Sequence, residues 1–128
     1  MRMEVGLRMG FGILQINVTS LGVHIVTWLL GNQCKYDIIL LQEHKLRGTK
    51  FAKVRNKLRR KYDVYASPAP TLNRGARGGV MILVRKGRIV QRFFSIVSSH
   101  SMWEAITVRV QGRTLGFASV YLPLVSTP

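Results

Sequence analysis

Few residues in this sequence could carry out acid–base or metal chemistry. Lys and Arg number 20, whereas the carboxylates number only 5: Glu4, Asp37, Glu43, Asp63 and Glu104. A hydrolase that needs several carboxylates for metal binding and proton transfer would use nearly the whole set. The single cysteine, Cys34, excludes an internal disulfide and a zinc site built on cysteines. We therefore expect a reducing, intracellular compartment, nucleus or cytoplasm, over secretion.

The positive charge is the strongest compositional signal. The formal charge of +15 argues against a cation-buffering protein and indicates a polyanionic partner, most often nucleic acid. Apolar residues make up 47%, which is enough for a packed core and too many for a disordered tail. A length of 128 residues fits one domain.

Much of this charge lies in one segment. Between Lys45 and Lys61 there are nine Lys or Arg residues and no acidic residue. Thr49 can cap a helix that buries an apolar stripe and ends near Lys61. Its surrounding cations include Lys50, Lys53 and Lys57. Unmixed positive charge repels itself unless an anion neutralises it, so we expect phosphate-backbone contacts here, the alternative being a solvated helix face.

The elements before this segment would position an amide and a carboxylate. Residues 13–18 alternate as a strand, a helix capped by Ser20 follows and stops at Gly31, and residues 38–41 form a continuous apolar run. A strand, a crossover helix and a buried strand make a parallel unit whose strands end at the same sheet edge. Asn17 and Glu43 would then converge. The alternative is that both are ordinary polar residues where strands meet solvent.

The remaining sequence predicts mainly antiparallel strands, at 62–66, 80–84, 89–97, 103–110 and 114–122. A flexible loop over 73–79 carries Arg74 and Arg77, which could contact phosphate. Glu104 shares a strand face with apolar residues and needs a partner there. Residues 1–12 are expected to be a loose leader. The uncharged stretch from Met9 to Cys34 raises a membrane-helix alternative, which its interspersed polar residues disfavour.

Four motifs in this order resemble the endonuclease/exonuclease/phosphatase superfamily, and most closely the apurinic-endonuclease-like domain of non-LTR retrotransposons. The motifs are the strand ending in Asn17, the run Asp37-Ile-Ile-Leu-Leu-Gln-Glu-His-Lys45, the strand Arg77-Gly-Gly-Val-Met-Ile-Leu-Val84, and Ser119-Val-Tyr-Leu-Pro123. The resemblance implies an α/β fold, here the N-terminal half of a four-layered α/β sandwich, in which a βαβ start is followed by mainly antiparallel strands. It also implies a metal-dependent phosphodiester hydrolase, an endonuclease, that acts on nucleic acid, DNA above all. Independently of the resemblance, the polar residues between Met9 and Cys34 lead us to expect no membrane partner.

The resemblance also implies roles for individual residues. Glu43 would be the main ligand of a catalytic Mg²⁺, with Mn²⁺ as an alternative, because that ion accepts one carboxylate plus waters and phosphate oxygens. Asn17 would orient metal-bound groups or phosphate. Lys45 would steady the Glu43 carboxylate and bind substrate, and Tyr121 would donate a hydrogen bond to phosphate.

The sequence departs from the family pattern at several points. Thr19 replaces a frequent acidic residue, and Leu124 replaces the asparagine that usually follows the Tyr-x-Pro motif. The Asp-x-Asn and Asp-His motifs of the family's second half do not occur in these residues. We therefore expect residues 13–128 to form a partial domain, truncated at its C-terminal side and inactive alone. The alternative is a small basic nucleic-acid-binding module without catalysis.

Overall fold

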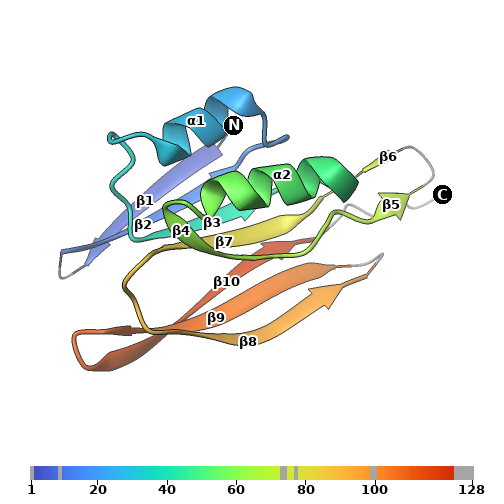
Figure 1. The fold of residues 1–128 in the computed structure, drawn as a ribbon. Coiled ribbons are helices and arrows are strands. Elements are labelled where there is room, and N and C mark those ends of the chain that lie inside the picture. Colours follow the sequence, from blue (N-terminus) through green and yellow to red (C-terminus); the bar gives the residue numbers. More distant parts are fainter. Residues whose placement is uncertain (1, 9, 73–74, 77, 99–100, 123–128) are drawn as a thin grey trace.

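The order of strands and helices follows the alternation expected from the sequence. The structure, a computed structural model, describes residues 2–8, 10–72, 75–76, 78–98 and 101–122. Within these residues it has two helices and ten strands, arranged as in Figure 1. They are β1 (Arg2–Arg8), β2 (Phe11–Asn17), α1 (Val23–Leu30), β3 (Ile38–Gln42), α2 (Gly48–Leu58), β4 (Tyr62–Ala66), β5 (Thr71–Leu72), β6 (Gly75–Ala76), β7 (Val80–Arg85), β8 (Val90–Val97), β9 (Met102–Val110) and β10 (Arg113–Tyr121).

The larger sheet has five strands in the order β1-β2-β3-β7-β4. Its strands β2 and β3 are parallel, as predicted, and Asn17 lies opposite Gln42 in their register. The expectation of a loose leader is wrong for Arg2–Arg8, because this segment pairs antiparallel with β2 along its whole length. The leader was expected from the methionines and glycines of residues 1–12, although Met3, Val5 and Leu7 alternate with polar residues or glycine as they do in a strand. The side chains described for β1 are all exposed at the edge of the sheet.

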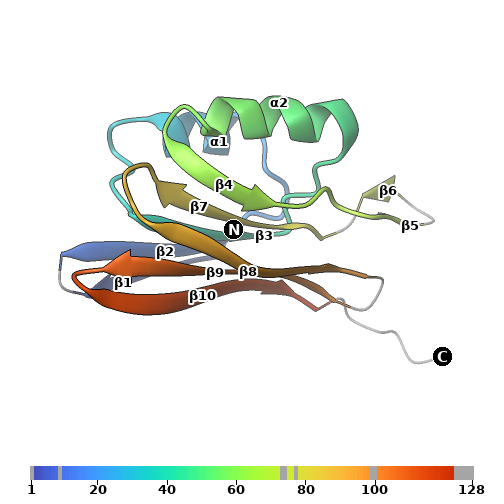
Figure 2. The ribbon, with the colours of Figure 1, turned by 60° about the horizontal axis from the view of Figure 1, so that its bottom comes forward.

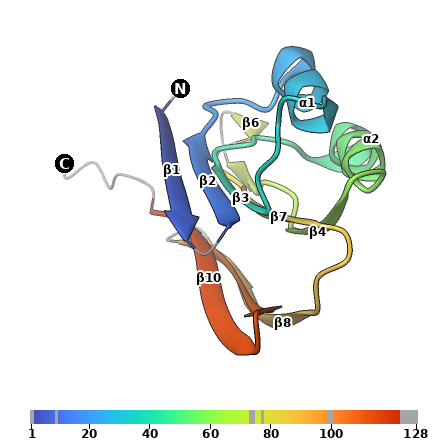
Figure 3. The same ribbon diagram turned by 90° about the vertical axis from the view of Figure 1, so that its left-hand side faces the viewer.

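Both helices cover one face of this sheet (Figure 3). Their apolar sides pack on alternate residues of β2, β3 and β7 in a core that includes Leu14, Leu29, Leu41 and Phe51. The predicted caps are wrong: α1 begins after Gly22 and α2 after Arg47, and neither helix start has a capping hydrogen bond from a side chain. Packing of the buried helix faces, more than capping by Ser20 or Thr49, therefore sets where these short helices start.

The second sheet has three strands in the order β10-β9-β8, and β9 and β10 lie against β3 and β7 (Figure 2). A second core between the sheets includes Ile38, Ile82, Ile106 and Val108. The strand β3 is therefore buried on both faces, as its continuous apolar run predicts.

The predicted α/β class is confirmed, and the unit β2–α1–β3 is a parallel βαβ unit followed by antiparallel pairs, although the β1–β2 hairpin precedes it. Within the described part of the chain the layers are helices, the five-stranded sheet and the three-stranded sheet (Figure 1). No helix among the described residues is long and apolar enough to cross a membrane.

Candidate functional site

The carboxyl ends of β2 and β3 lie side by side and are tied together by the main chain. The amide of Val18 donates to the carbonyl of Gln42 at 3.1 Å, and the amide of Leu21 donates to the carbonyl of His44 at 3.1 Å. Asn17 is the last residue of β2, and Glu43 follows the last residue of the neighbouring strand β3, so both lie at the same edge of the sheet. This is the position where open α/β sheets carry their ligand sites.

Backbone strain is concentrated at this edge. Among the described residues other than glycine, four have a positive φ, and three of them are Thr19 (58°), Glu43 (60°) and Lys45 (56°). A left-handed conformation costs a non-glycine residue about 1–2 kcal/mol and is especially unfavourable for β-branched threonine. Such strain persists only where the surrounding structure over-determines it, and it is enriched at functional sites.

The two predicted polar groups differ in how they are held. Asn17 is half-buried, and its Oδ1 accepts a hydrogen bond from the Thr19 amide at 3.1 Å. Glu43 is also half-buried, but its carboxylate has no hydrogen bond or ion pair with any residue that the structure describes. A carboxylate without a protein partner at a strained strand end is open to a cation or a ligand.

Two glycines bring Tyr121 and His44 against this edge. Gly78 and Gly79 have φ values of 69° and 91°, and an added Cβ would lie 2.6 Å from the ring of Tyr121 and 2.4 Å from that of His44, respectively. The same glycines pair with the Glu43–Lys45 segment, because the Lys45 amide donates to the Gly78 carbonyl at 2.8 Å. Gly78-Gly79 therefore contacts both the Glu43–Lys45 segment and the ring of Tyr121.

The sequence did not single out His44 as a site residue. Its ring is fully buried, Nδ1 accepts a hydrogen bond from the Leu46 amide at 2.9 Å, and Nε2 lies 3.1 Å from the Ser67 carbonyl. Because Nδ1 accepts, Nε2 carries the proton and donates to Ser67. Burial lowers the pKa of His44 to about 4, partly opposed by the Ser67 hydrogen bond, so the ring is neutral at pH 7. A histidine between the charged residues Glu43 and Lys45 would be expected to be exposed. The pair Gly78-Gly79, which leaves room for the ring, is the only sequence feature that points to its burial.

Buried polar groups join this edge to the three-stranded sheet. Gln42 donates through Nε2 to Ser119 Oγ at 2.8 Å, and the Ser119 hydroxyl donates to the Leu41 carbonyl at 2.8 Å. Glu104, paired with Ser119 in the register, is fully buried and has the partner that its apolar face required. Its carboxylate accepts from Arg92 at 2.7–2.8 Å and from Ser95 at 2.9 Å. Glu104 is therefore occupied within the sandwich.

The predicted substrate-binding cations that the structure describes are Lys45 and three lysines of α2. Lys45 is exposed and forms no ion pair with Glu43, so the expected support of that carboxylate by Lys45 is not seen. Lys50, Lys53 and Lys57 are exposed along α2, whose first turn follows the Glu43–Lys45 segment closely in sequence. An open groove of about 890 Å³ runs beside that first turn and is lined by residues that include Arg47 and Lys50.

Two predictions about other basic residues, Lys61 and the arginines of the 73–79 loop, have different outcomes. Lys61 was expected at the end of the basic helix; its Nζ instead donates to three carbonyls at the end of α1, those of Leu29, Gly31 and Cys34, at 2.6–2.9 Å. The reason is that Lys61 lies past the last turn of α2, where its side chain reaches the C-terminal end of α1, whose last carbonyls have no partner within the helix. Arg74 and Arg77 lie outside the described residues.

The residues at this edge suit only a metal that needs few protein ligands. The described residues contain no group of three or more His, Cys, Asp or Glu side chains that could hold a metal ion. Zinc and calcium normally require more protein ligands than one carboxylate. Mg²⁺ is commonly held by one or two carboxylates together with waters and phosphate oxygens, so the open Glu43 carboxylate at this sheet edge fits Mg²⁺ or Mn²⁺.

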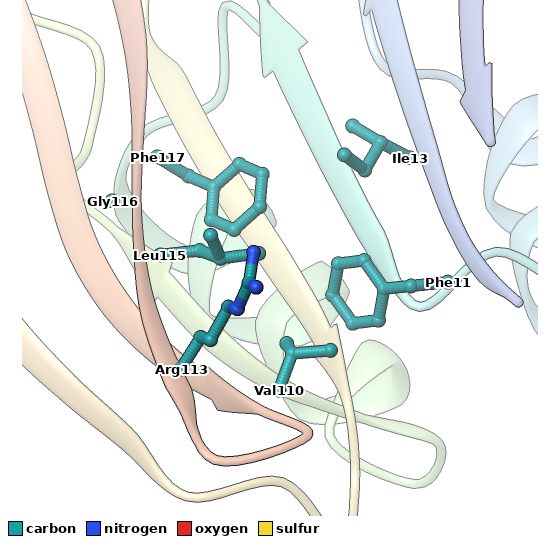
Figure 4. A pocket seen from close by; sticks show the side chains of 7 residues that line it. All are labelled: Phe11, Ile13, Val110, Arg113, Leu115, Gly116 and Phe117. Atoms are coloured by element: carbon teal, nitrogen blue, oxygen red, sulfur yellow. The ribbon is translucent and has the colours of Figure 1, made fainter. Parts of the chain in front are cut away.

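A separate hollow lies at the other end of β2. It has a volume of about 260 Å³ and lies between the two sheets, where Phe11 and Ile13 face Leu115 and Phe117 (Figure 4). Apart from Arg113 its lining side chains are apolar. Phe11 and Asn17 are the first and last residues of β2, which separates them by about 20 Å. This hollow is therefore not part of the strand-end site.

Comparison of the chain with family models and with curated proteins finds no match in either set. The interpretation of the site accordingly depends on its residues and geometry.

Proposed function

We propose that this chain carries the metal- and phosphate-binding part of a metal-dependent phosphodiester hydrolase that acts on nucleic acid, of the endonuclease/exonuclease/phosphatase type. The proposal depends mainly on the environment of the Glu43 carboxylate. Glu43 is half-buried, its carboxylate has no partner among the described residues, and it follows the last residue of the central strand β3, which pairs with Asn17 at the end of β2. The +15 charge of the chain supports a polyanionic substrate.

Each residue at the site has a defined part in this proposal. Glu43, with Asn17 beside it, would hold Mg²⁺ or Mn²⁺, which when bound polarises a phosphodiester and promotes attack by water. The Asn17 amide nitrogen can donate to a phosphate oxygen, because only its oxygen is engaged by Thr19. Tyr121 would donate its hydroxyl proton in a hydrogen bond to phosphate, and Lys45 would supply a positive charge to the same group.

The proposed function also concerns the fold of the whole domain and the motifs that hydrolysis needs. We propose that the observed layers belong to a four-layered α/β sandwich, with this chain supplying its N-terminal half. Hydrolysis in that family also uses an Asp-x-Asn motif and a closing Asp-His pair, neither of which occurs in these 128 residues. We therefore expect the isolated chain to bind a divalent cation and nucleic acid but not to cleave a phosphodiester.

Metal binding is tested directly with Mn²⁺. Binding is measured by electron paramagnetic resonance for the full chain and for Glu43→Gln, with Glu4→Gln as the matched control because Glu4 is an exposed carboxylate on β1. We expect Glu43→Gln to abolish the bound fraction that the wild-type chain and Glu4→Gln retain. Equal Mn²⁺ binding by Glu43→Gln and wild type would overturn the metal assignment.

A non-catalytic nucleic-acid-binding module remains the second candidate, and the exposed lysines of α2 favour it. None of Lys50, Lys53 and Lys57 forms an ion pair with a described residue. Replacing all three by Gln should weaken binding of a fluorescein-labelled 20-base-pair duplex. It should also reduce the slope of log K against log salt by up to about 2.7, since each phosphate contact contributes about 0.9.

The same triple change made at Lys35, Lys86 and Arg113, which are exposed elsewhere, is the control and should alter the slope less. Binding that depends on α2 but is unchanged by Glu43→Gln, in a chain that binds no Mn²⁺, would favour the second candidate. Equal effects of the two triple changes would remove α2 as the interface.

A further inference from the structure

Two residues of the segment Glu43–Lys45 have left-handed backbone conformations, which contacts within the fold maintain. Glu43 and Lys45, on either side of His44, have φ values of 60° and 56°. An isolated chain would relax both residues toward negative φ, since each left-handed residue costs about 1–2 kcal/mol. The contacts that prevent this relaxation are therefore the contacts that decide where the Glu43 and Lys45 side chains emerge.

Most of these contacts converge on His44. Its amide donates to the Gly79 carbonyl at 3.3 Å, and its carbonyl accepts from Leu21 at 3.1 Å. Its ring then turns inward, where Nδ1 accepts from the Leu46 amide at 2.9 Å and Nε2 reaches the Ser67 carbonyl at 3.1 Å. The backbone before and after Lys45 is thus fixed by one side chain through the Nδ1 bond, which spans only two residues.

The space around the ring is closed on its remaining sides. A Cβ on Gly79 would lie 2.4–2.7 Å from three ring atoms, so the ring rests directly on the Gly79 backbone. The Phe51 ring of α2 lies at a centroid distance of 5.8 Å from it. Because the ring is enclosed between Gly79, which precedes β7, the helix α2 and the segment after β4, its position cannot change without moving Glu43 and Lys45.

We propose that His44 is a positioning residue, which holds Glu43 and Lys45 in the left-handed conformations from which their side chains reach the metal and the phosphate. The inference rests on the proposed function of Glu43 as metal ligand. His44 does not touch the ligand. It acts through the main chain of its two neighbours, and the Leu46 hydrogen bond to Nδ1 is the decisive contact.

Two substitutions separate the two ring nitrogens. His44→Asn places an amide oxygen near the position of Nδ1 and can accept from Leu46, whereas His44→Gln reaches further and can donate to Ser67 but not accept from Leu46 in the same way. His44→Phe keeps a planar ring and removes both hydrogen bonds. Val108→Ala, at a fully buried position in the core between the sheets, supplies a variant that is destabilised far from the segment.

The test measures the Mn²⁺ dissociation constant of the full chain at neutral pH, with the free energy of unfolding measured for each variant. Support around a metal ligand typically changes metal affinity by about 10- to 100-fold, so we expect His44→Phe and His44→Gln to weaken Mn²⁺ binding by about 10-fold or more. His44→Asn should restore near wild-type affinity, and Val108→Ala should lower stability without changing affinity. Hydrogen exchange at the Leu46 amide should accelerate in His44→Gln and not in His44→Asn.

The outcomes distinguish the inference from the function on which it rests. Wild-type Mn²⁺ affinity in both His44→Phe and His44→Gln, with affinity lost in Glu43→Gln, would overturn the positioning role and leave the metal site standing. Equal loss in Val108→Ala would also overturn it, because loss of global stability would then explain the effect. Mn²⁺ binding unaffected by Glu43→Gln would overturn the proposed function itself. If His44→Phe does not fold, the comparison of His44→Asn with His44→Gln still decides.

Discussion

Removing Arg92 would leave a buried carboxylate without its cation. The Glu104 side chain is 0% exposed, and Arg92 contacts it through two nitrogens at 2.7 and 2.8 Å. In Arg92→Met the apolar part of the arginine is retained, but the carboxylate keeps only its hydrogen bond from Ser95. Breaking a buried ion pair from one side costs about 3–5 kcal/mol, and because the Arg92 side chain is 48% exposed we expect the lower end, about 3 kcal/mol.

This change is large enough to measure in two ways. For a chain of 128 residues the entropy of unfolding implies that about 3 kcal/mol lowers the melting temperature by about 10 °C. Urea unfolding followed by circular dichroism at pH 7 gives the free energy directly. Arg2→Met is the control, because the Arg2–Glu4 pair is similarly close at 3.1 Å but exposed, and its loss should cost about 0.5 kcal/mol or less.

A second substitution, Glu104→Gln, tests whether the buried charge causes the loss of stability. If the cost comes from an uncompensated buried charge, adding Glu104→Gln to Arg92→Met should restore stability, because the neutral amide keeps a polar contact with Ser95 and carries no charge. A double variant less stable than Arg92→Met alone would refute this account. So would an Arg92→Met variant no less stable than Arg2→Met.

Two further predictions concern the His44 ring. In metal-free buffer, burial lowers the pKa of His44 from 6.5 to about 4 in the folded chain. The unfolded chain therefore takes up a proton more readily, so the stability that is present above pH 6.5 is lost as the pH falls toward 4. We expect the free energy of unfolding, measured by urea titration, to fall by about 2 kcal/mol between pH 7 and pH 5. His44→Gln should remove that loss, and an unchanged pH profile would contradict the prediction. Gly79→Ala should destabilise by about 3 kcal/mol or more, because its Cβ meets the ring, whereas Gly87→Ala, at a similar φ of 101° but in open space, should cost about 1 kcal/mol; equal melting temperatures of the two variants would exclude the clash.

Much of the strand pattern could be predicted because burial on two faces and on one face leave different sequence patterns. The continuous apolar run that becomes β3 and the alternation in β2 identified the parallel pair, and that pair alone placed Asn17 and Glu43 at one edge. Helix starts were predicted less well, since Ser20 and Thr49 are good caps locally but the buried sides of α1 and α2 decide the register. The edge strand β1 was not predicted, although Met3, Val5 and Leu7 alternate along it with polar residues or glycine; the side chains described for it are exposed.

By itself the sequence determined the charge, the shortage of carboxylates, the α/β class and the convergence of two polar strand ends. These features follow from composition and from periodicities that act over a few residues. Only the tertiary structure decided which groups are occupied and which are open. Glu104 is held by Arg92 and Ser95, whereas the Glu43 carboxylate has no partner among the described residues. It also decided that His44 is buried against Gly79, because that contact joins residues 35 positions apart and no local pattern records it.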